Sequence, residues 1–121
     1  MIAHSALPRL HDIRDAIKGI FETISGVTFE TYCDVWHIRR ATERGIEIIS
    51  EASRHVPDGL KAKHANVPWQ EIAAIGNILR HEYARIEDEI IWQVTQRYLA
   101  DLEKAIDDMI SDFERLGTTI G

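Results

Sequence analysis

Four polar side chains that could act together on a phosphodiester lie within two helical turns, in the segment 75–83. His81 can move protons near neutral pH, and the neighbouring Arg80 can stabilise charge on phosphate oxygens. Asn77 supplies an amide that can orient a substrate backbone, and Tyr83 supplies a phenol. Proton transfer combined with charge stabilisation is the chemistry that phosphodiester cleavage requires.

Helix geometry places these groups on neighbouring faces. Residues four apart share a face, so Asn77 lies one turn before His81 and Arg80 lies one turn after Gly76. The Arg80 side chain leans toward the helix N-terminus, back over position 76. Gly76 itself has two interpretations: close packing between helices, or room for a nucleotide or a partner's Arg80. With room there, an arginine at position 76 in an Arg80→Ala background is expected to recover part of any activity.

Metal and cofactor chemistry find little support in the motifs. The segment from His81 to Arg85 begins like the zinc peptidase motif His-Glu-x-x-His, but Arg85 stands where the second ligand must be. The chain has no Gly-rich phosphate loop and no Ser nucleophile motif. Cys33, the single cysteine, fits a small buried hydrophobe better than a nucleophile. A lone cysteine also excludes an internal disulfide, which fits a cytoplasmic protein. We therefore expect no metal site and no cofactor.

The elements that position these residues all show helical periodicity, with apolar residues three and four apart. The 121 residues, 45% of them hydrophobic, suffice for one domain with one core, spanning 1–121. Thr28 could cap the second segment, and Pro68 suits the start of the third. The pattern predicts an all-α antiparallel bundle of about four helices, over approximately 5–24, 28–54, 68–82 and 90–117, with a single turn at 61–65.

Charge and leftover apolar surface suggest the partners. The net charge of −6 argues against a general nucleic-acid-coating protein, but basic residues gather between Lys61 and Arg85. Any RNA contact should therefore be local, at the His81 end. Leftover apolar positions, with the three tryptophans as core or interface anchors, predict a homodimer whose two His81 side chains face one cleft. No apolar run is long enough to span a membrane.

A second charged feature is a stripe on the segment 28–54. Arg40 and Glu43, and likewise Arg44 and Glu47, stand three apart and are expected to pair on the helix surface. This stripe is either a solvated face or a surface for a partner protein.

Several motifs together resemble the HepT-like ribonucleases of the HEPN superfamily. Their signature is an Arg, four to six residues, then His, any residue and Tyr, which here ends in His81 and Tyr83. The arginine is absent, because positions 74–76 read Ala-Ile-Gly. Three further segments match in order and spacing, so that the resemblance covers about 35–102: 44–52, with Ser50 in place of glycine, 67–69 (Val-Pro-Trp) and 89–94.

The resemblance implies a homodimeric, metal-independent endoribonuclease toxin encoded beside a minimal nucleotidyltransferase antitoxin. The antitoxin would silence the toxin by adenylylating the signature tyrosine, here Tyr83. Under this hypothesis His81, Arg80 and Asn77 are catalytic, with Arg80 replacing the missing arginine one helical turn away. The alternative is a catalytically impaired binding module that engages the nucleotidyltransferase without cutting RNA.

Overall fold

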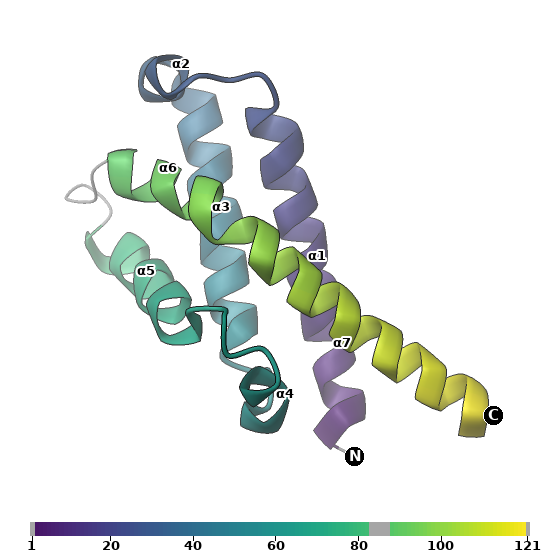
Figure 1. The fold of residues 1–121 in the computed structure, drawn as a ribbon. Coiled ribbons are helices and arrows are strands. Elements are labelled where there is room, and N and C mark those ends of the chain that lie inside the picture. Colours follow the sequence, from purple (N-terminus) through teal and green to yellow (C-terminus); the bar gives the residue numbers. More distant parts are fainter. Residues whose placement is uncertain (1, 83–87, 121) are drawn as a thin grey trace.

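The computed structural model describes the backbone of residues 2–82 and 88–120, and the side chains of residues 6–79 and 88–116. Over these residues the chain is all-α, with no strand, as the sequence predicted (Figure 1). The helices are α1 (Ile2–Ile24), α2 (Phe29–Asp34), α3 (Trp36–Ser53), α4 (Asp58–Ala62), α5 (Trp69–Glu82), α6 (Asp88–Arg97) and α7 (Leu99–Ile120). Among these residues no helix is both long and apolar enough to cross a membrane.

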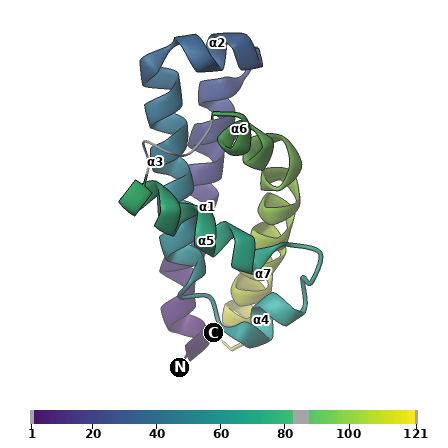
Figure 2. The same cartoon turned by 90° about the vertical axis from the view of Figure 1, so that its left-hand side faces the viewer.

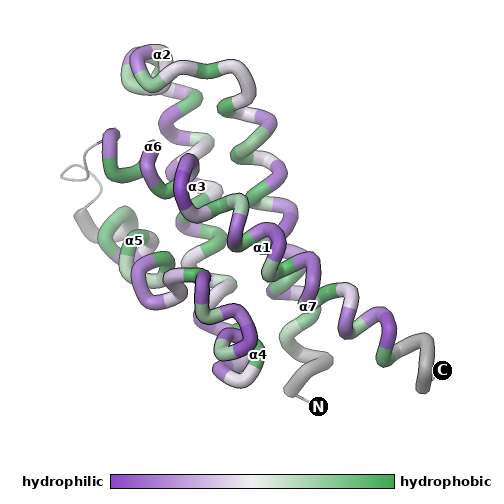
Figure 3. Tube along the Cα trace, in the orientation of Figure 1, coloured by the Kyte–Doolittle hydropathy of each residue, from purple (hydrophilic) through white to green (hydrophobic). Residues whose placement is uncertain are grey.

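Helix α3 is the centre of the bundle. It runs antiparallel to α1 on one side and is crossed by α5 on the other, while α7 packs along α1 (Figures 1 and 2). The apolar stripe of α1 faces inward, where Leu10, Ile13 and Ile17 have no exposed surface. Helices α5 and α6 also carry hydrophobic positions (Figure 3). The core therefore holds α5 across α3, and α5 carries the signature residues.

The helices are more divided than the sequence predicted. The expected helix over 28–54 is two helices, because the extended backbone of Val35 (φ −102°, ψ 105°) separates α2 from α3. The expected last helix is interrupted at Tyr98, three residues after Thr95. The Thr95 hydroxyl donates to the Trp92 carbonyl at 2.6 Å, a back-bond of the kind that bends helices. The turn expected at 61–65 is the short helix α4, which begins earlier, at Asp58.

The start of α2 follows its predicted capping. Thr28 adopts extended backbone angles, and its hydroxyl accepts a hydrogen bond from the Thr31 backbone N–H at 3.1 Å. The cap turns the chain so that Tyr32 is buried and Phe29 reaches Trp92, with 6.0 Å between ring centroids. This packing joins α2 to α6 at one end of the bundle.

Candidate functional site

The C-terminal half of α5 carries the predicted site. Leu79 is buried and anchors this half to the core, whereas Asn77 is exposed. Arg80 and His81 belong to the last turn of α5, but their side chains lie outside the described residues, and so does all of Tyr83. The helix thus places Arg80 one turn after Gly76, as the spacing predicted. The catalytic roles of Asn77, Arg80 and His81 stay predictions.

Position 76 has no room for a side chain on the face toward α3. A Cβ atom added to Gly76 would lie 2.1 Å from both Cβ and Oγ of Ser50. The Ser50 hydroxyl is itself fixed, because it donates to the Ala73 carbonyl at 2.8 Å. The same carbonyl accepts a hydrogen bond from the Arg54 guanidinium at 3.1 Å. Gly76 therefore serves close helix packing, and the expectation that an arginine could simply be placed there is wrong.

On its other side Gly76 borders a polar hollow of about 200 Å³ between α1, α3 and α5. Arg44 and Glu47 of α3 line this hollow, and Arg9 and Asp12 of α1 close it. The guanidinium of Arg44 lies 3.7 Å from the Glu47 carboxylate, and 70% of the Arg44 side chain is exposed. Arg44, for which the sequence predicted only a surface ion pair, thus lies beside the helix that carries the signature residues.

Helix α3 also carries Arg40 and Trp36, which lie four and eight residues before Arg44. The predicted pair of Arg40 and Glu43 forms, at 2.8 Å, but Glu43 is only 9% exposed rather than solvated. The Arg40 guanidinium also lies 5.8 Å from the centroid of the Trp36 ring. Trp36 is 63% exposed, so of the two predicted roles, core or interface anchor, the core role is excluded. The four-residue spacing of Trp36, Arg40 and Arg44 was the feature of the sequence that could have indicated their common helix face.

The junction of α2, α3 and α6 holds a buried phenol. Tyr32 has no exposed surface, and its hydroxyl has no hydrogen-bond partner among the described residues. Burial, followed by the charges of Glu43 and Asp88, raises the pKa of Tyr32 well above its ordinary value, so the phenol stays neutral. An ion pair of 4.0 Å between Arg39 and Asp88 crosses the same junction. It ties the start of α3 to the start of α6.

The Cys33 thiol, beside this junction, is not activated. Desolvation and the nearby Asp88 carboxylate raise the pKa of Cys33, which disfavours the thiolate that a nucleophile needs. The interpretation of Cys33 as a packing residue is consistent with this direction, since it packs against the core.

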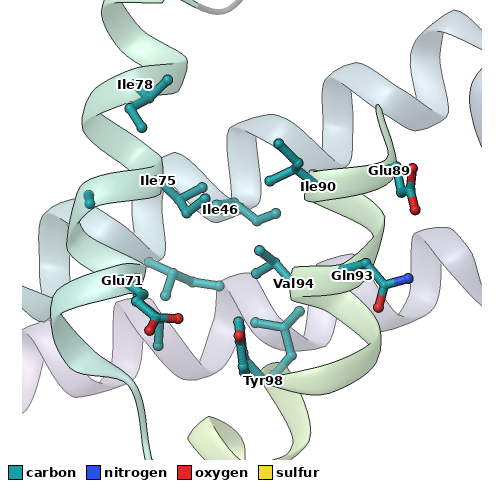
Figure 4. A pocket seen from close by; sticks show the side chains of 13 residues that line it. Ile46, Glu71, Ile75, Ile78, Glu89, Ile90, Gln93, Val94 and Tyr98 are labelled. Carbon is teal, nitrogen blue, oxygen red and sulfur yellow. The ribbon is translucent and has the colours of Figure 1, made fainter. Parts of the chain in front are cut away.

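An apolar groove of about 420 Å³ separates α5 from α6. Figure 4 shows Ile75 and Ile78 on one wall and Ile90 and Val94 on the other. Ile78 and Ile90 are 37% and 42% exposed, which is unusual for large aliphatic side chains so close together. Tyr98 lines the far end of the groove. Because Ile78 stands one turn before the end of α5, this surface borders the signature.

The described side chains include no group of three or more His, Cys, Asp or Glu residues that could hold a metal ion. The five histidines other than His81 also show no ligand spacing in the sequence. The described part of the site therefore holds the Asn77 amide, guanidinium groups and aromatic rings, and the last turn of α5 carries His81, whose side chain lies outside the described residues.

Known proteins resemble this chain over most of its length. A family described as "Ribonuclease HepT-like" matches residues 13–109. A protein named "Putative RNase" from Caldanaerobacter subterraneus subsp. tengcongensis is 33% identical over 103 residues, 85% of this chain and 92% of the relative. A "Probable ribonuclease HepT" from Thermococcus cleftensis is 31% identical, covering 78% of this chain and 86% of the relative. No solved structure gives a significant match.

Proposed function

Because the chain belongs to the HepT-like ribonuclease family, we propose that it is a metal-independent endoribonuclease acting on RNA in the cytoplasm. The observation that carries this proposal is the family match over residues 13–109, which includes α5 and therefore His81. The exposure of Asn77 one turn before His81 supports it, because a substrate must reach this face of the helix.

The proposed reaction uses only side chains. His81 accepts the proton of the ribose 2′-hydroxyl as that oxygen attacks the adjacent phosphorus. A bond forms between the 2′-oxygen and phosphorus, and the bond from phosphorus to the 5′-oxygen breaks. The leaving 5′-oxygen takes a proton from a second His81, while Arg80 stabilises the charge on the phosphate oxygens and Asn77 orients the strand. A histidine suits both roles, because its pKa lies near neutral pH.

A second His81 requires a second copy of the chain. We propose that two copies pair through the groove between α5 and α6, since its exposed Ile78 and Ile90 are apolar surface that pairing would cover. Ile78 lies three residues before His81, so pairing here would bring the two signature ends together. A twofold interface buries the same patch on both copies, which fits a single groove of this kind.

The function and the dimer can be tested together. Wild-type protein should cleave labelled single-stranded RNA in the presence of EDTA and should have the mass of a dimer by light scattering. Ile78→Glu should give monomers and lose most of the cleavage, because a carboxylate cannot be buried in an apolar interface without a partner. Leu116→Glu is the matched control, since Leu116 is 57% exposed on α7 and does not line the groove.

Two results would count against these proposals. An Ile78→Glu variant that stays dimeric would place the interface elsewhere. A dimeric wild type that is unmodified at Tyr83 and leaves RNA intact would favour the alternative, a HEPN binding module that engages its partner without cutting RNA.

We further propose that a minimal nucleotidyltransferase silences this protein, as the antitoxin of a toxin–antitoxin pair, by adenylylating Tyr83. The chain has three tyrosines. Tyr32 has no exposed surface, and Tyr98 is half-buried in the wall of the groove, so neither is a good acceptor. An adenylate on Tyr83 would bring negative charge beside His81 and repel RNA.

Intact mass measurement tests the modification. Co-expression with the cognate nucleotidyltransferase should add adenylate mass increments to wild-type protein and remove its cleavage. The increments should vanish in Tyr83→Phe and persist in Tyr98→Phe, the matched control. Increments that remain in Tyr83→Phe would place the point of control on another residue.

A further inference from the structure

Three residues form a continuous stripe along the first half of α3: Trp36, Arg40 and Arg44. They are four residues apart, so each lies about 6 Å from the next on one helix face. Trp36 is the most exposed of the large hydrophobic residues in the described part of the chain, at 63%. Helix α5 crosses α3, and the last turn of α5 extends past α3 (Figure 2).

The upper part of the stripe is preformed. The Arg40 guanidinium lies 5.8 Å from the Trp36 ring centroid and is held by Glu43 at 2.8 Å. Glu43 is 9% exposed, so the surface shows mainly the ring and the guanidinium rather than the carboxylate. A flat aromatic ring beside a cation is the combination that binds unpaired bases and their phosphates.

The lower end of the stripe reaches the signature helix. Arg44 and Gly76 line the same hollow, which places the Arg44 guanidinium near the α5 turn that precedes His81. The carboxylates of Asp12, Glu47 and Glu51 also line this hollow, so its interior does not favour a phosphate. The solvent-facing part of Arg44 does favour a phosphate, because 70% of that side chain is exposed and its guanidinium lies as far as 3.7 Å from the Glu47 carboxylate.

We propose that Trp36, Arg40 and Arg44 bind the single-stranded stretch of RNA that leads to the phosphodiester at His81. One base stacks on Trp36, and successive phosphates contact Arg40 and Arg44. The stripe suits a single strand rather than a duplex, since paired bases would hide the ring faces that stack on Trp36. The inference rests on the proposed ribonuclease function and adds to it the place where the substrate strand is held.

Binding can be measured without cleavage by fluorescence anisotropy, with a labelled 2′-O-methyl oligonucleotide that lacks the nucleophilic hydroxyl. Trp36→Ala should raise the Kd by about ten-fold, and Trp36→Tyr should restore most of the affinity. Arg44→Ala should also weaken binding and should lower the slope of log affinity against log salt by about 0.7, the value for one phosphate contact on a single strand. Arg97→Ala, which removes the same charge from an exposed site on α6, is the matched control and should bind like wild type.

A fourth variant tests the electrostatic part separately. Glu47→Gln removes the carboxylate that competes with a phosphate for Arg44, so this variant should bind the oligonucleotide more tightly than wild type. If Glu47 had only a structural role, its replacement by Gln would not raise the affinity for the oligonucleotide.

The outcomes separate this inference from the proposed function. If wild type cleaves and binds RNA while Trp36→Ala and Arg44→Ala bind equally well, the stripe is overturned and the ribonuclease stands. If those variants bind RNA normally but no longer bind the nucleotidyltransferase, the stripe is a protein-binding surface and the inference is wrong. A wild type that neither cleaves nor binds RNA would overturn the inference and the proposed ribonuclease together.

Discussion

Arg80→Ala should lower metal-free RNA cleavage by about 100- to 1000-fold, the loss typical of removing one group that stabilises transition-state charge. His81→Ala should cause a loss at least as large, because no other histidine lies in the signature segment. The reason for a large Arg80 effect is steric. Position 76, one of the three positions (74–76) at which the signature arginine would fall, is closed by Ser50, so an arginine cannot act from there and a cation must come from another position. Arg80 stands one turn further along the same face.

Initial rates on a labelled single-stranded RNA in EDTA would measure both losses, with thermal unfolding followed in parallel. Arg97→Ala is the control for the loss of one positive charge, and it should keep the wild-type rate. Both site variants should unfold at nearly the wild-type temperature, since substitutions in the last turn of a helix generally cost little stability. An Arg80→Ala enzyme that cleaves at the wild-type rate would show that this arginine is incidental and that another cation serves His81.

Gly76→Ala should lower the free energy of unfolding by about 1–3 kcal/mol, although alanine is the better helix former. The added methyl group would meet Cβ and Oγ of Ser50 at 2.1 Å, and the hydrogen bond from Ser50 to Ala73 restricts the movement that could relieve it. Gly76→Arg should be worse still, because no rotamer avoids the clash at its own Cβ. The exchange of Arg80 for an arginine at position 76 should therefore fail to recover activity.

Ser50→Gly should relieve the clash. Without the serine side chain, a Cβ atom at position 76 would lie 3.6 Å from the Cα of residue 50, which is ordinary van der Waals contact. The single change Ser50→Gly loses a hydrogen bond and adds a helical glycine, so it is expected to destabilise by about 1–2 kcal/mol. The two substitutions should then be coupled, by about 1–2 kcal/mol in a double-mutant cycle.

Urea unfolding of the wild type, both single variants and the double variant would measure this coupling. Gly19→Ala is the matched control, because a Cβ atom at that helical position meets nothing within 4 Å. Gly19→Ala should stabilise the protein by about 0.5–1 kcal/mol. Additive effects of Ser50→Gly and Gly76→Ala would show that α5 can move away from α3 without loss.

The sequence predicted the bundle and the signature helix well, because both depend on local patterns. Apolar residues three and four apart identified α1, and Pro68 stands directly before the observed start of α5 at Trp69. The helix interruptions at Val35 and Tyr98 could not be predicted in the same way, since neither position is a Pro or a Gly. The break at Val35 accompanies the burial of Tyr32, a residue of α2, in the core, whereas the break at Tyr98 follows the hydrogen bond from the Thr95 hydroxyl to the Trp92 carbonyl.

The candidate site was predictable along the helix but not across it. The spacing of Asn77, Arg80 and His81 follows from one element, whereas the roles of Gly76 and Trp36 depend on contacts between elements. The sequence allowed two roles for Gly76, close packing or open space, and the contact with Ser50 decides for close packing. The sequence left Trp36 as either a core or an interface anchor, and its place at the start of α3, at the end of the bundle, leaves it in solvent. Periodicity specifies which face a residue occupies, but not what covers that face.

The contact between Ser50 and Gly76 also constrains how this chain could change over generations. An arginine that arose first at position 76 would meet a filled space, and the resulting protein would lose stability at once. A glycine that arose first at position 50 would weaken one helix contact but leave room for a later, larger residue at position 76. The two substitutions are thus accessible in one order and not in the other. A serine on a different helix thus keeps an arginine out of position 76.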